Sequence, residues 1–318
     1  MIFASLRRAG VLGINRRNAC YTLRWNPRRF YPLVDDKLAT KRLCEAAGIP
    51  VPKLLAVARH HFRIRALLPA LDAYESFVLK PGRGAMGNGI VVITGRREGR
   101  LVRASGRTLR PEAFDYHAAG IISGLYSLGG QPDIAMVEEQ LVAHPLFAEL
   151  ATQGVPDVRV IVYRGVPVMA MTRLPTHASD GRANLHQGAL GVGIDLVSGR
   201  TRFAIQRGRP ALANPDSGRA VLGVEIPAFD RILDIAVQAA DRTHLGYVGA
   251  DVVSDATRGP VILELNARPG LAIQLANGAG LLHRLAAVDA LAGVARPLAE
   301  RIELGRGLAG RALARRAA

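Results

Sequence analysis

The chain has 318 residues, of which 49% are hydrophobic, so it can bury a core in two or three lobes and is not a disordered protein. Its formal charge is +16, from 42 Lys and Arg against 26 Asp and Glu, but the basic residues are mainly scattered arginines and form no lysine-rich strip. No apolar run reaches the roughly 18–20 residues that span a bilayer, so no transmembrane segment is predicted.

Several kinds of partner fit this charge. We favour a compositional bias together with an anionic small substrate, and keep nucleic acid and an anionic membrane surface as alternatives. The chain starts with early arginines and lacks the apolar stretch of a signal peptide. The two cysteines, Cys20 and Cys44, form no metal or redox motif, so we expect reduced thiols in a cytoplasmic protein.

The first half of the sequence predicts two helices and three strands around a glycine-rich run. Residues 1–34 are basic and predicted to be irregular. A helix follows, which an aspartate can cap and which ends at Gly48, because Pro50 and Pro52 forbid its continuation. Strands are predicted at 77–80, 90–93 and 133–141, with the run PGRGAMGNG between the first two and a helix at about 110–128.

The second half predicts a hairpin, a helix and two closing strands. Residues 158–174 form two strands joined at Arg164-Gly165, and 230–247 form an amphipathic helix. Strands at 249–253 and 260–266 follow, and a basic helical tail covers 304–318. Hairpins mixed with crossovers predict an α+β (mixed α/β) fold with antiparallel sheets, and not a doubly wound nucleotide-binding fold.

The decapeptide VILELNARPG, residues 261–270, carries the first candidate site. Glu264 and Asn266 are two apart on a strand and so share one face, while Leu263 and Leu265 turn toward the core. Asp251 on the preceding strand can lie beside them as an antiparallel partner. Two carboxylates and an amide oxygen suit Mg²⁺ or Mn²⁺. The alternative is the solvent face of an edge strand.

A lysine at a strand end, followed by glycines, is a layout that handles phosphate. Lys80 precedes the glycine-rich run, whose bare backbone N–H groups can approach an anion closely. The run is neither a Walker loop nor a GxGxxG turn that opens a helix. It predicts a flap over phosphates, and the alternative is an ordinary hairpin loop.

The stretch MVEEQL, residues 136–141, has two consecutive carboxylates on a strand. As a linker between lobes, its backbone could hydrogen-bond an adenine edge, and Glu139 could reach the adenine amino group or a ribose hydroxyl. The alternative is an edge strand with a solvated acidic face.

A concentration of cations follows. Asp157 and Arg159 lie on one face of a strand, and Arg173 ends the hairpin partner. The planar donor fork of arginine suits carboxylates, phosphates and a negatively charged transition state. The following loop contains Arg182, Asn184 and His186. Surface arginines are the alternative, and His186 is either a catalytic base or a plain loop histidine.

In this order, the motifs resemble those of the ATP-grasp enzymes, and most closely the RimK-like ligases, which add L-glutamate to a protein or small acceptor. More narrowly, the start GINRRN…NPRR.YPLVDDK resembles an alpha-L-glutamate ligase-related group. The resemblance runs from about residue 35 to about 280 and rests on DDK (35–37), FVLKP (77–81), the glycine loop (82–89), VEEQL (137–141), DVR (157–159), TR (172–173), RANLHQGA (182–189), GAD (249–251) and LELNARPG (263–270).

The resemblance implies roles for these residues. Nucleotide-binding roles fall on Lys80, Gly84, Gly87, Gly89, Glu138, Glu139, Gln140, Leu141, Asp157, Arg182, Asn184 and Leu263. Metal-binding roles fall on Asp251, Glu264 and Asn266, and catalytic roles on Arg268, Arg173, Arg159 and Arg182. It also implies a fold of two α+β lobes that clasp ATP between antiparallel sheets, with 1–70 as the N-terminal segment, 71–137 as a lid subdomain and 138–318 as the catalytic subdomain.

The implied reaction is an ADP-forming carboxylate–amine ligation through an acyl-phosphate, with ATP and two Mg²⁺ ions, for which Mn²⁺ can substitute. Glutamate is the expected amino-acid donor and an amine-bearing peptide or small molecule the acceptor, in a protein that can be a homodimer. Two alternatives stay open. One is a ligase of cell-surface polysaccharide or peptide synthesis, and the other is a catalytically silent nucleotide-binding regulatory module.

The start of the chain departs from the RimK-like pattern. About 35 residues precede the DDK motif, which is too few for the α/β domain that RimK-like enzymes carry there. The arginines of NRRN and NPRR have no family role, and we expect them either to bind an anionic acceptor or to be surface arginines.

Overall fold

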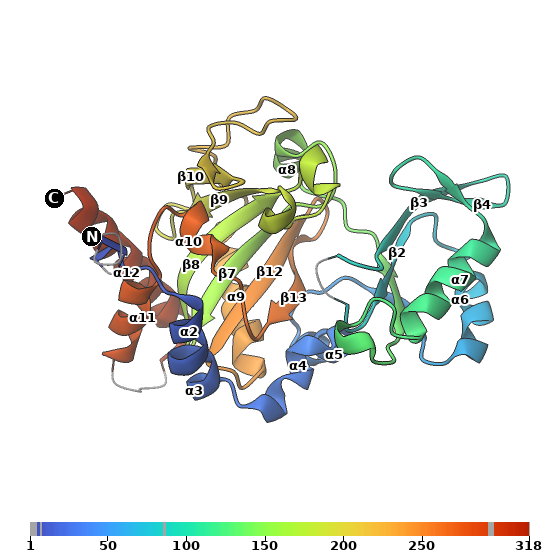
Figure 1. The fold of residues 1–318 in the computed structure, drawn as a ribbon, viewed down its shortest axis with the longest axis horizontal. Coiled ribbons are helices and arrows are strands. Elements are labelled where there is room, and N and C mark those ends of the chain that lie inside the picture. Colours follow the sequence, from blue (N-terminus) through green and yellow to red (C-terminus); the bar gives the residue numbers. More distant parts are fainter. Residues whose placement is uncertain (1–4, 7, 85–86, 292–295, 318) are drawn as a thin grey trace. The chain divides into compact units, whose positions relative to one another are not determined.

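The computed structural model describes residues 5–6, 8–84, 87–291 and 296–317. The chain divides into two compact units (Figure 1). Unit 1 comprises Met1–Asp35, Arg42–Pro50 and Val142–Ala318, and unit 2 comprises Asp36–Lys41 and Val51–Leu141. Each unit has its own antiparallel sheet and its own hydrophobic core.

Unit 2 is a six-stranded sheet with helices packed on it. The strand order is β1 (Leu54–Ala58), β6 (Ala135–Glu139), β2 (Phe77–Pro81), β3 (Val91–Arg97), β4 (Arg100–Arg103) and β5 (Thr108–Leu109). The predicted strands β2, β3 and β6 and the helix α7 (Pro111–Ile122) are confirmed, whereas β1, β4 and β5 were not predicted. Phe77, Leu79, Phe114 and Ile121 are fully buried between sheet and helix. The remaining helical turns are His61–Ala66, α6 (Leu67–Ala70) and Leu128–Gly130.

Unit 1 is a seven-stranded sheet. Its order is β11 (Arg209–Pro210), β10 (Thr201–Gln206), β9 (Leu190–Ile194), β8 (Val166–Leu174), β7 (Asp157–Tyr163), β12 (Tyr247–Asp255) and β13 (Gly259–Asn266). The β7–β8 hairpin turns at Arg164 and Gly165, as predicted, with φ values of 49° and 75°, so both turn residues are left-handed and match a type I′ turn. The strands β9–β11 were not predicted, because glycines and arginines interrupt their apolar pattern.

One face of this sheet carries both apolar and charged residues. Alternation along β7 puts Asp157 and Arg159 on the same face as Ile161 and Tyr163, with the charged pair at one end of the strand. The apolar end packs on Tyr247 of β12 and on helices α10 (Ala272–Ala276) and α11 (Leu282–Asp289). Helix α9 (Phe229–Arg242), predicted as amphipathic, also packs on the sheet, and α8 (Pro145–Leu150) and α12 (Leu298–Ala317) complete the unit (Figure 1).

The prediction of an irregular N-terminus is wrong for the described residues of 1–34. Ile14–Trp25 is one continuous helical stretch, made of α2 (Ile14–Arg16), a π-helical turn (Arg17–Thr22) and α3 (Leu23–Trp25). Its Tyr21 packs edge-on against Tyr163, with ring centroids 5.4 Å apart. The buried face of this helix also includes Arg17 and Thr22, so the segment lacks the apolar periodicity that predicts a helix.

The segment continues through Arg28–Phe30 and α4 (Pro32–Asp35) into α5 (Lys37–Ala46). Asp36 caps α5 as predicted, because its Oδ1 accepts hydrogen bonds from the amides of Leu38 at 2.9 Å and Ala39 at 3.1 Å. Gly48 follows the helix with a φ of 67°. Across the described ranges, no helix is both long enough and apolar enough to span a membrane.

Candidate functional site

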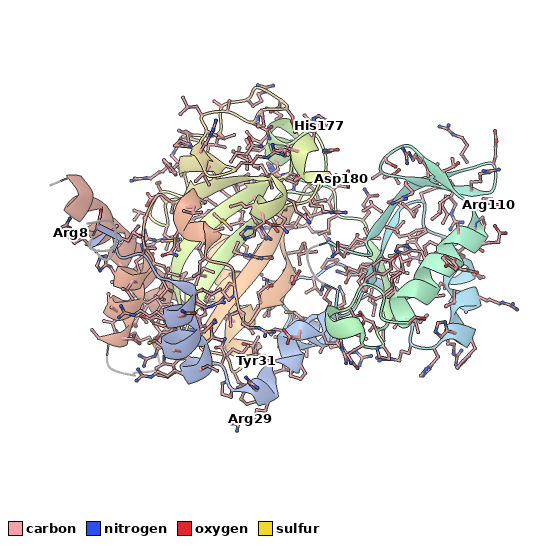
Figure 2. The ribbon with its side chains drawn as sticks, in the orientation of Figure 1. Arg8, Arg29, Tyr31, Arg110, His177 and Asp180 are labelled. Carbon is pink, nitrogen blue, oxygen red and sulfur yellow. The ribbon has the colours of Figure 1, made fainter. Side chains whose placement is uncertain are left out.

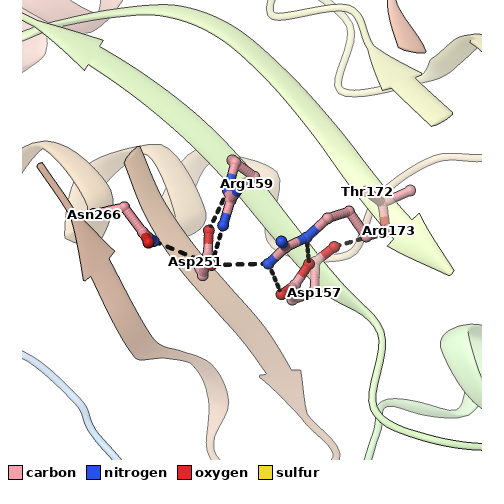
Figure 3. Close-up of polar contacts among 6 residues, drawn as sticks. All are labelled: Asp157, Arg159, Thr172, Arg173, Asp251 and Asn266. Atoms are coloured by element: carbon pink, nitrogen blue, oxygen red, sulfur yellow. Dashed lines mark hydrogen bonds and ion pairs between the residues drawn. The ribbon is translucent and has the colours of Figure 1, made fainter. Parts of the chain in front are cut away.

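Four charged side chains of unit 1 form a largely buried network on β7, β8 and β12 (Figure 3). Cross-strand register places them, because Arg159 is the Cα partner of Asp251 and Asp157 is the partner of Arg173. Arg159 makes a bidentate contact with Asp251, in which Nε lies 2.7 Å from Oδ1 and Nη2 lies 2.6 Å from Oδ2. Arg173 binds Asp157 through Nε, at 2.7 Å, and through Nη2, which also reaches Asp251 Oδ2 at 2.8 Å.

The pKa values of the two acids in this network are shifted in opposite directions. Burial raises the pKa of Asp157 to about 6, against the lowering effect of Arg173 and with a further rise from Asp251. Burial alone would also raise the pKa of Asp251, but Arg159 and Arg173 outweigh it and hold that pKa below its usual 3.8. Burial would lower the pKa of Arg173, but the carboxylates raise it above its usual value. Asp251 is therefore ionised.

Asp251, Glu264 and Asn266 come together as predicted from their strand positions. Glu264 is the Cα partner of Asp251, and Asn266 Nδ2 lies 3.4 Å from Asp251 Oδ2. The register slips by one residue beyond Asp251, so Leu263 is the extra residue of a bulge. This explains why Leu263 is only half-buried instead of facing the core, while Leu265 is buried as expected.

This donor set fits a hard divalent cation such as Mg²⁺ or Mn²⁺, which prefers carboxylate and amide oxygens. Among the residues that the structure describes, no three His, Cys, Asp or Glu side chains group to hold a metal, so the set needs the amide oxygen of Asn266. Both oxygens of Asp251 accept hydrogen bonds from arginines, so a cation would replace one guanidinium contact.

Arg268 lies in the loop that follows β13 and faces the N-terminal segment. Its guanidinium is 5.2 Å from the ring centroid of Tyr31, and its Nη2 is 3.6 Å from Asp35 Oδ2. The side chain is 53% exposed, so it can reach an oxyanion from solvent. Its catalytic role stays a prediction.

The loop between β8 and β9 holds the remaining predicted residues of unit 1. Asn184 caps the short helical turn Leu185–Gln187 by accepting a hydrogen bond from the amide of His186 at 3.0 Å. Arg182 is partly exposed and lies 3.8 Å from Asp180, which Figure 2 labels on the same loop. His186 is exposed. The contacts described for these residues do not connect them to the charged network, so their roles also stay predictions.

In unit 2, a buried carboxylate lies between two lysines. Glu138 on β6 is 4% exposed; its Oε1 is 2.9 Å from Lys41 Nζ and its Oε2 binds Lys80 of β2. Burial alone would raise the pKa of Glu138, but Lys80 and Lys41 outweigh it and hold that pKa below 4.5. Because β6 pairs with β1 and β2 on its two sides, the edge-strand alternative is wrong.

Sequence reasoning missed Lys41. The signal was its spacing of four from Lys37, which puts both lysines on one face of α5. Lys37 Nζ donates to the carbonyl oxygen of Gly84 at 2.6 Å, so this face of α5 serves both Glu138 and the glycine-rich loop.

The residues after Glu138 lie at the end of the strand. The side chain of Glu139 accepts a hydrogen bond from the amide of Lys53, and its own amide donates to the Lys53 carbonyl oxygen at 3.0 Å. Gln140 is half-buried and Leu141 is buried. Glu138 and Glu139 therefore differ in environment, which their sequence did not reveal.

The glycine-rich loop is anchored at both ends. Asp133 accepts hydrogen bonds from the amide of Arg83 at 2.9 and 3.1 Å, and the carbonyl oxygen of Gly89 is bonded to His117 Nε2 at 2.9 Å. Gly87 and Gly89 both have φ values of 76°, and a Cβ on Gly89 would lie 2.6 Å from the Tyr126 ring. Residues 85–86 of the predicted flap lie outside the described residues.

The chain is a protein of the ATP-grasp class, because a model of an ATP-grasp family matches more than half of it. That family is described as sugar-transfer associated ATP-grasp, the match covers residues 16–290, and the chain belongs to this family. The match does not by itself show the narrower RimK-like group. No curated protein matches the chain.

Solved structures that match the chain include several ligases. The ATP-grasp ligase PsnB, in complex with a minimal precursor, is 18% identical with a TM-score of 0.43, over 87% of this chain and 64% of that one. D-cycloserine synthetase DcsG is 14% identical with a TM-score of 0.45, over 90% of this chain and 73% of that one. D-alanine–D-alanine ligase from Bacillus anthracis, complexed with ATP, is 12% identical with a TM-score of 0.43, over 89% and 68%. The chain thus spans less than two thirds of PsnB.

Proposed function

We propose that this protein is an ATP-dependent ligase that joins a carboxylate to an amine and releases ADP and phosphate. The observation that carries the proposal is the cross-strand placement of Asp251 beside Glu264, next to a buried pair of arginines. Membership of the ATP-grasp class supports it.

In unit 2, Lys80 and Lys41 would bind phosphate oxygens, with the backbone amides of the glycine-rich loop. Glu138 fixes the positions of both ammonium groups, because it is buried against them. Backbone groups and side chains of Glu139, Gln140 and Leu141 would hold the adenine and ribose.

In the first step, a carboxylate oxygen of the donor bonds to the γ-phosphorus of ATP and the bond to the β-phosphate oxygen breaks, giving an acyl-phosphate and ADP. In the second step, the amine bonds to the acyl carbon, phosphate leaves and the amine loses a proton. Arg159 and Arg173 orient Asp251 and keep it ionised, and Arg268 offers a half-exposed guanidinium to the developing oxyanion. Mg²⁺, held by Asp251, Glu264 and Asn266, would neutralise phosphate charge when bound.

The donor and acceptor are the finer part of the proposal. The resemblance to RimK-like motifs favours L-glutamate as the donor. The family's description as sugar-transfer associated favours a second candidate, a ligase whose amine acceptor is a sugar or a sugar-linked compound. Both candidate reactions use an amine as the attacking group, and an experiment must identify the molecule that carries it.

ADP release from ATP and Mg²⁺ tests the proposal. Each proteinogenic amino acid is supplied alone, with a glutamate-ending peptide and with an amino sugar, and mass spectrometry identifies the products. We expect a signal that requires both donor and acceptor and that Glu264→Gln removes, because this change takes away one carboxylate of the metal set. Glu303→Gln, a carboxylate on the exposed side of α12, is the matched control and should keep full activity.

ADP released at the same rate in wild type and Glu264→Gln would contradict the metal assignment. Tight ATP binding without any product over the whole panel would favour the catalytically silent nucleotide-binding module.

A further inference from the structure

The loop Ala267–Gly270, which follows the metal strand and carries Arg268, is bound by side chains from the N-terminal segment. Asn26 is 2% exposed, and its Nδ2 donates to the carbonyl oxygens of Tyr247, at 2.7 Å, and Ala267, at 2.8 Å. Its Oδ1 accepts from the amide of Tyr247 at 2.9 Å. One buried amide therefore ties the start of β12 to the loop after β13.

Arg17 makes a second attachment from the same segment. It is 7% exposed, and its Nη1 donates to the carbonyl oxygen of Pro269 at 2.8 Å, while its Nε donates to Asn18 Oδ1 at 2.8 Å. The bound carbonyls belong to Ala267 and Pro269, which stand on either side of Arg268. The peptide plane before Arg268 and the peptide plane after Pro269 are thus each held by a donated hydrogen bond.

The side chain of Arg268 contacts the same segment. Tyr31 lies under its guanidinium, and Asp35 lies 3.6 Å from it. Backbone contact is also close, because the amide of Gly246 donates to the Trp25 carbonyl oxygen at 2.8 Å and a Cβ on Gly246 would lie 2.8 Å from Trp25 Cβ. The segment and the start of β12 are therefore in close backbone contact at Trp25 and Gly246.

We propose that residues 17–35 form a bracket that positions the loop Ala267–Gly270, and that Arg17 and Asn26 are positioning residues for Arg268 and for the adjoining metal ligand Asn266. The inference rests on the proposed ligase function and assigns a role to two residues of the NRRN and NPRR motifs. Arg17 is not a surface arginine that could bind an acceptor, because it is buried and its guanidinium donates to the carbonyl oxygen of Pro269 in the loop.

Removing Arg17 or Asn26 would leave carbonyl oxygens without their donors, which costs stability whether or not these side chains also position the loop. A polar network that is fully satisfied also fixes one geometry, so the test needs readouts of the loop and of the metal. Partners that orient a metal ligand typically change metal affinity or activity by roughly 10–100-fold when they are removed. A displacement of about 1 Å at a reacting group costs on the order of 100-fold in rate.

The test compares Arg17→Met and Asn26→Asp with Arg16→Met in the full chain. Arg17→Met keeps the apolar stem and removes both donated bonds. Asn26→Asp places a carboxylate against two carbonyl oxygens. Arg16 lies next to Arg17 but is exposed, so Arg16→Met is the matched control. Arg17→Lys restores one donor and should rescue part of the loss.

The first readout is hydrogen exchange of the amides of Ala267, Arg268 and Gly270, which needs no activity. We expect faster exchange there in Arg17→Met and Asn26→Asp, with the centre of β7 unchanged and Arg16→Met like wild type. The second readout is the Mg²⁺ dependence of ADP release. We expect kcat to fall roughly 10–100-fold and more Mg²⁺ to be required, with the KM for ATP little changed.

Loop exchange equal to that of Arg16→Met would overturn the proposal, as would a uniform rise in exchange over all of unit 1. If Asn26→Asp does not fold, the comparison of Arg17→Met with Arg17→Lys still tests the proposal. A wild-type chain that binds no ATP would remove the ligase function, while the exchange result would still decide whether the bracket holds the loop.

Discussion

A single buried charge, the carboxylate of Glu138, should contribute strongly to the unfolding free energy of unit 2. It is buried between Lys41 and Lys80, so Glu138→Gln keeps its shape and removes the negative charge from both lysines. We expect unit 2 to lose about 3–5 kcal/mol of unfolding free energy, the range for breaking a buried ion pair. Urea titration followed by hydrogen exchange in β2 and β6 measures this loss.

The same carboxylate gives a pH dependence with a defined sign. Its native pKa is lowered below 4.5 by the lysines, so the unfolded chain binds this proton more readily. The contribution of Glu138 is therefore complete above about pH 4.5 and is lost as the pH falls through the native pKa. Glu139→Gln, at the half-buried neighbour, is the control, and an equal loss in both variants would contradict the assignment.

Among the elements, the β12–β13 pair is sensitive to added volume at Gly249. Gly249 is the Cα partner of Asn266, and a Cβ at this position would lie 2.7 Å from Pro269 Cβ. Gly249→Ala must therefore push the loop away from β12. We expect a loss of about 1–3 kcal/mol in the unfolding free energy of unit 1, as for other overpacked positions. ADP release should fall further, because Asn266 and Arg268 move with the loop.

Gly270→Ala is the control for that change. It lies in the same loop, but a Cβ there would meet nothing within 4 Å, so stability and activity should stay near wild type. Comparable losses in the two variants would mean that the loop tolerates no side chain at all and that the contact with Pro269 is not the cause.

At the scale of single elements, the sequence predicted the structure correctly where a short stretch of residues determines the local conformation. The Arg164-Gly165 turn and the amphipathic α9 follow from local patterns and are confirmed. The pairing of Asp251 with Glu264 also followed, because strands joined by a short turn tend to pair. The bulge at Leu263 could not be predicted from the sequence, because it depends on the register between strands. It does not disturb the alternation of apolar and polar residues along β13.

The residues that sequence reasoning missed share one property. Lys41, Arg17 and Asn26 are polar side chains whose partners lie far away along the chain, as with Arg17 and Pro269. Periodicity treats a polar residue as exposed, so a helix face that is buried through Arg17 and Thr22 was predicted as irregular chain. Only the tertiary contacts show that these groups are buried and satisfied.

For the whole molecule, the charge of +16 is unevenly distributed along the chain. Several arginines of unit 1 are bound to carboxylates, namely Arg159, Arg173, Arg202, Arg301 and Arg306. By contrast, residues 1–34 contain seven arginines and no acidic residue, and some of them, such as Arg29 in Figure 2, are exposed. The paired arginines are balanced by their carboxylates, whereas the basic segment adds to the net charge.

Nucleotide binding should be visible in the hydrogen exchange of the folded protein. A ligand that binds only the folded state stabilises it by about 2.7 kcal/mol at a hundredfold excess over Kd. Because Lys80 and Lys41 are proposed to bind phosphate oxygens, we expect ADP with Mg²⁺ to slow hydrogen exchange around Lys80. Lys80→Met should remove this protection, and Arg110→Met, at an exposed arginine of unit 2 (Figure 2), should leave it intact. Exchange around Lys80 that ADP leaves unchanged would contradict the assignment of this lysine to the phosphates.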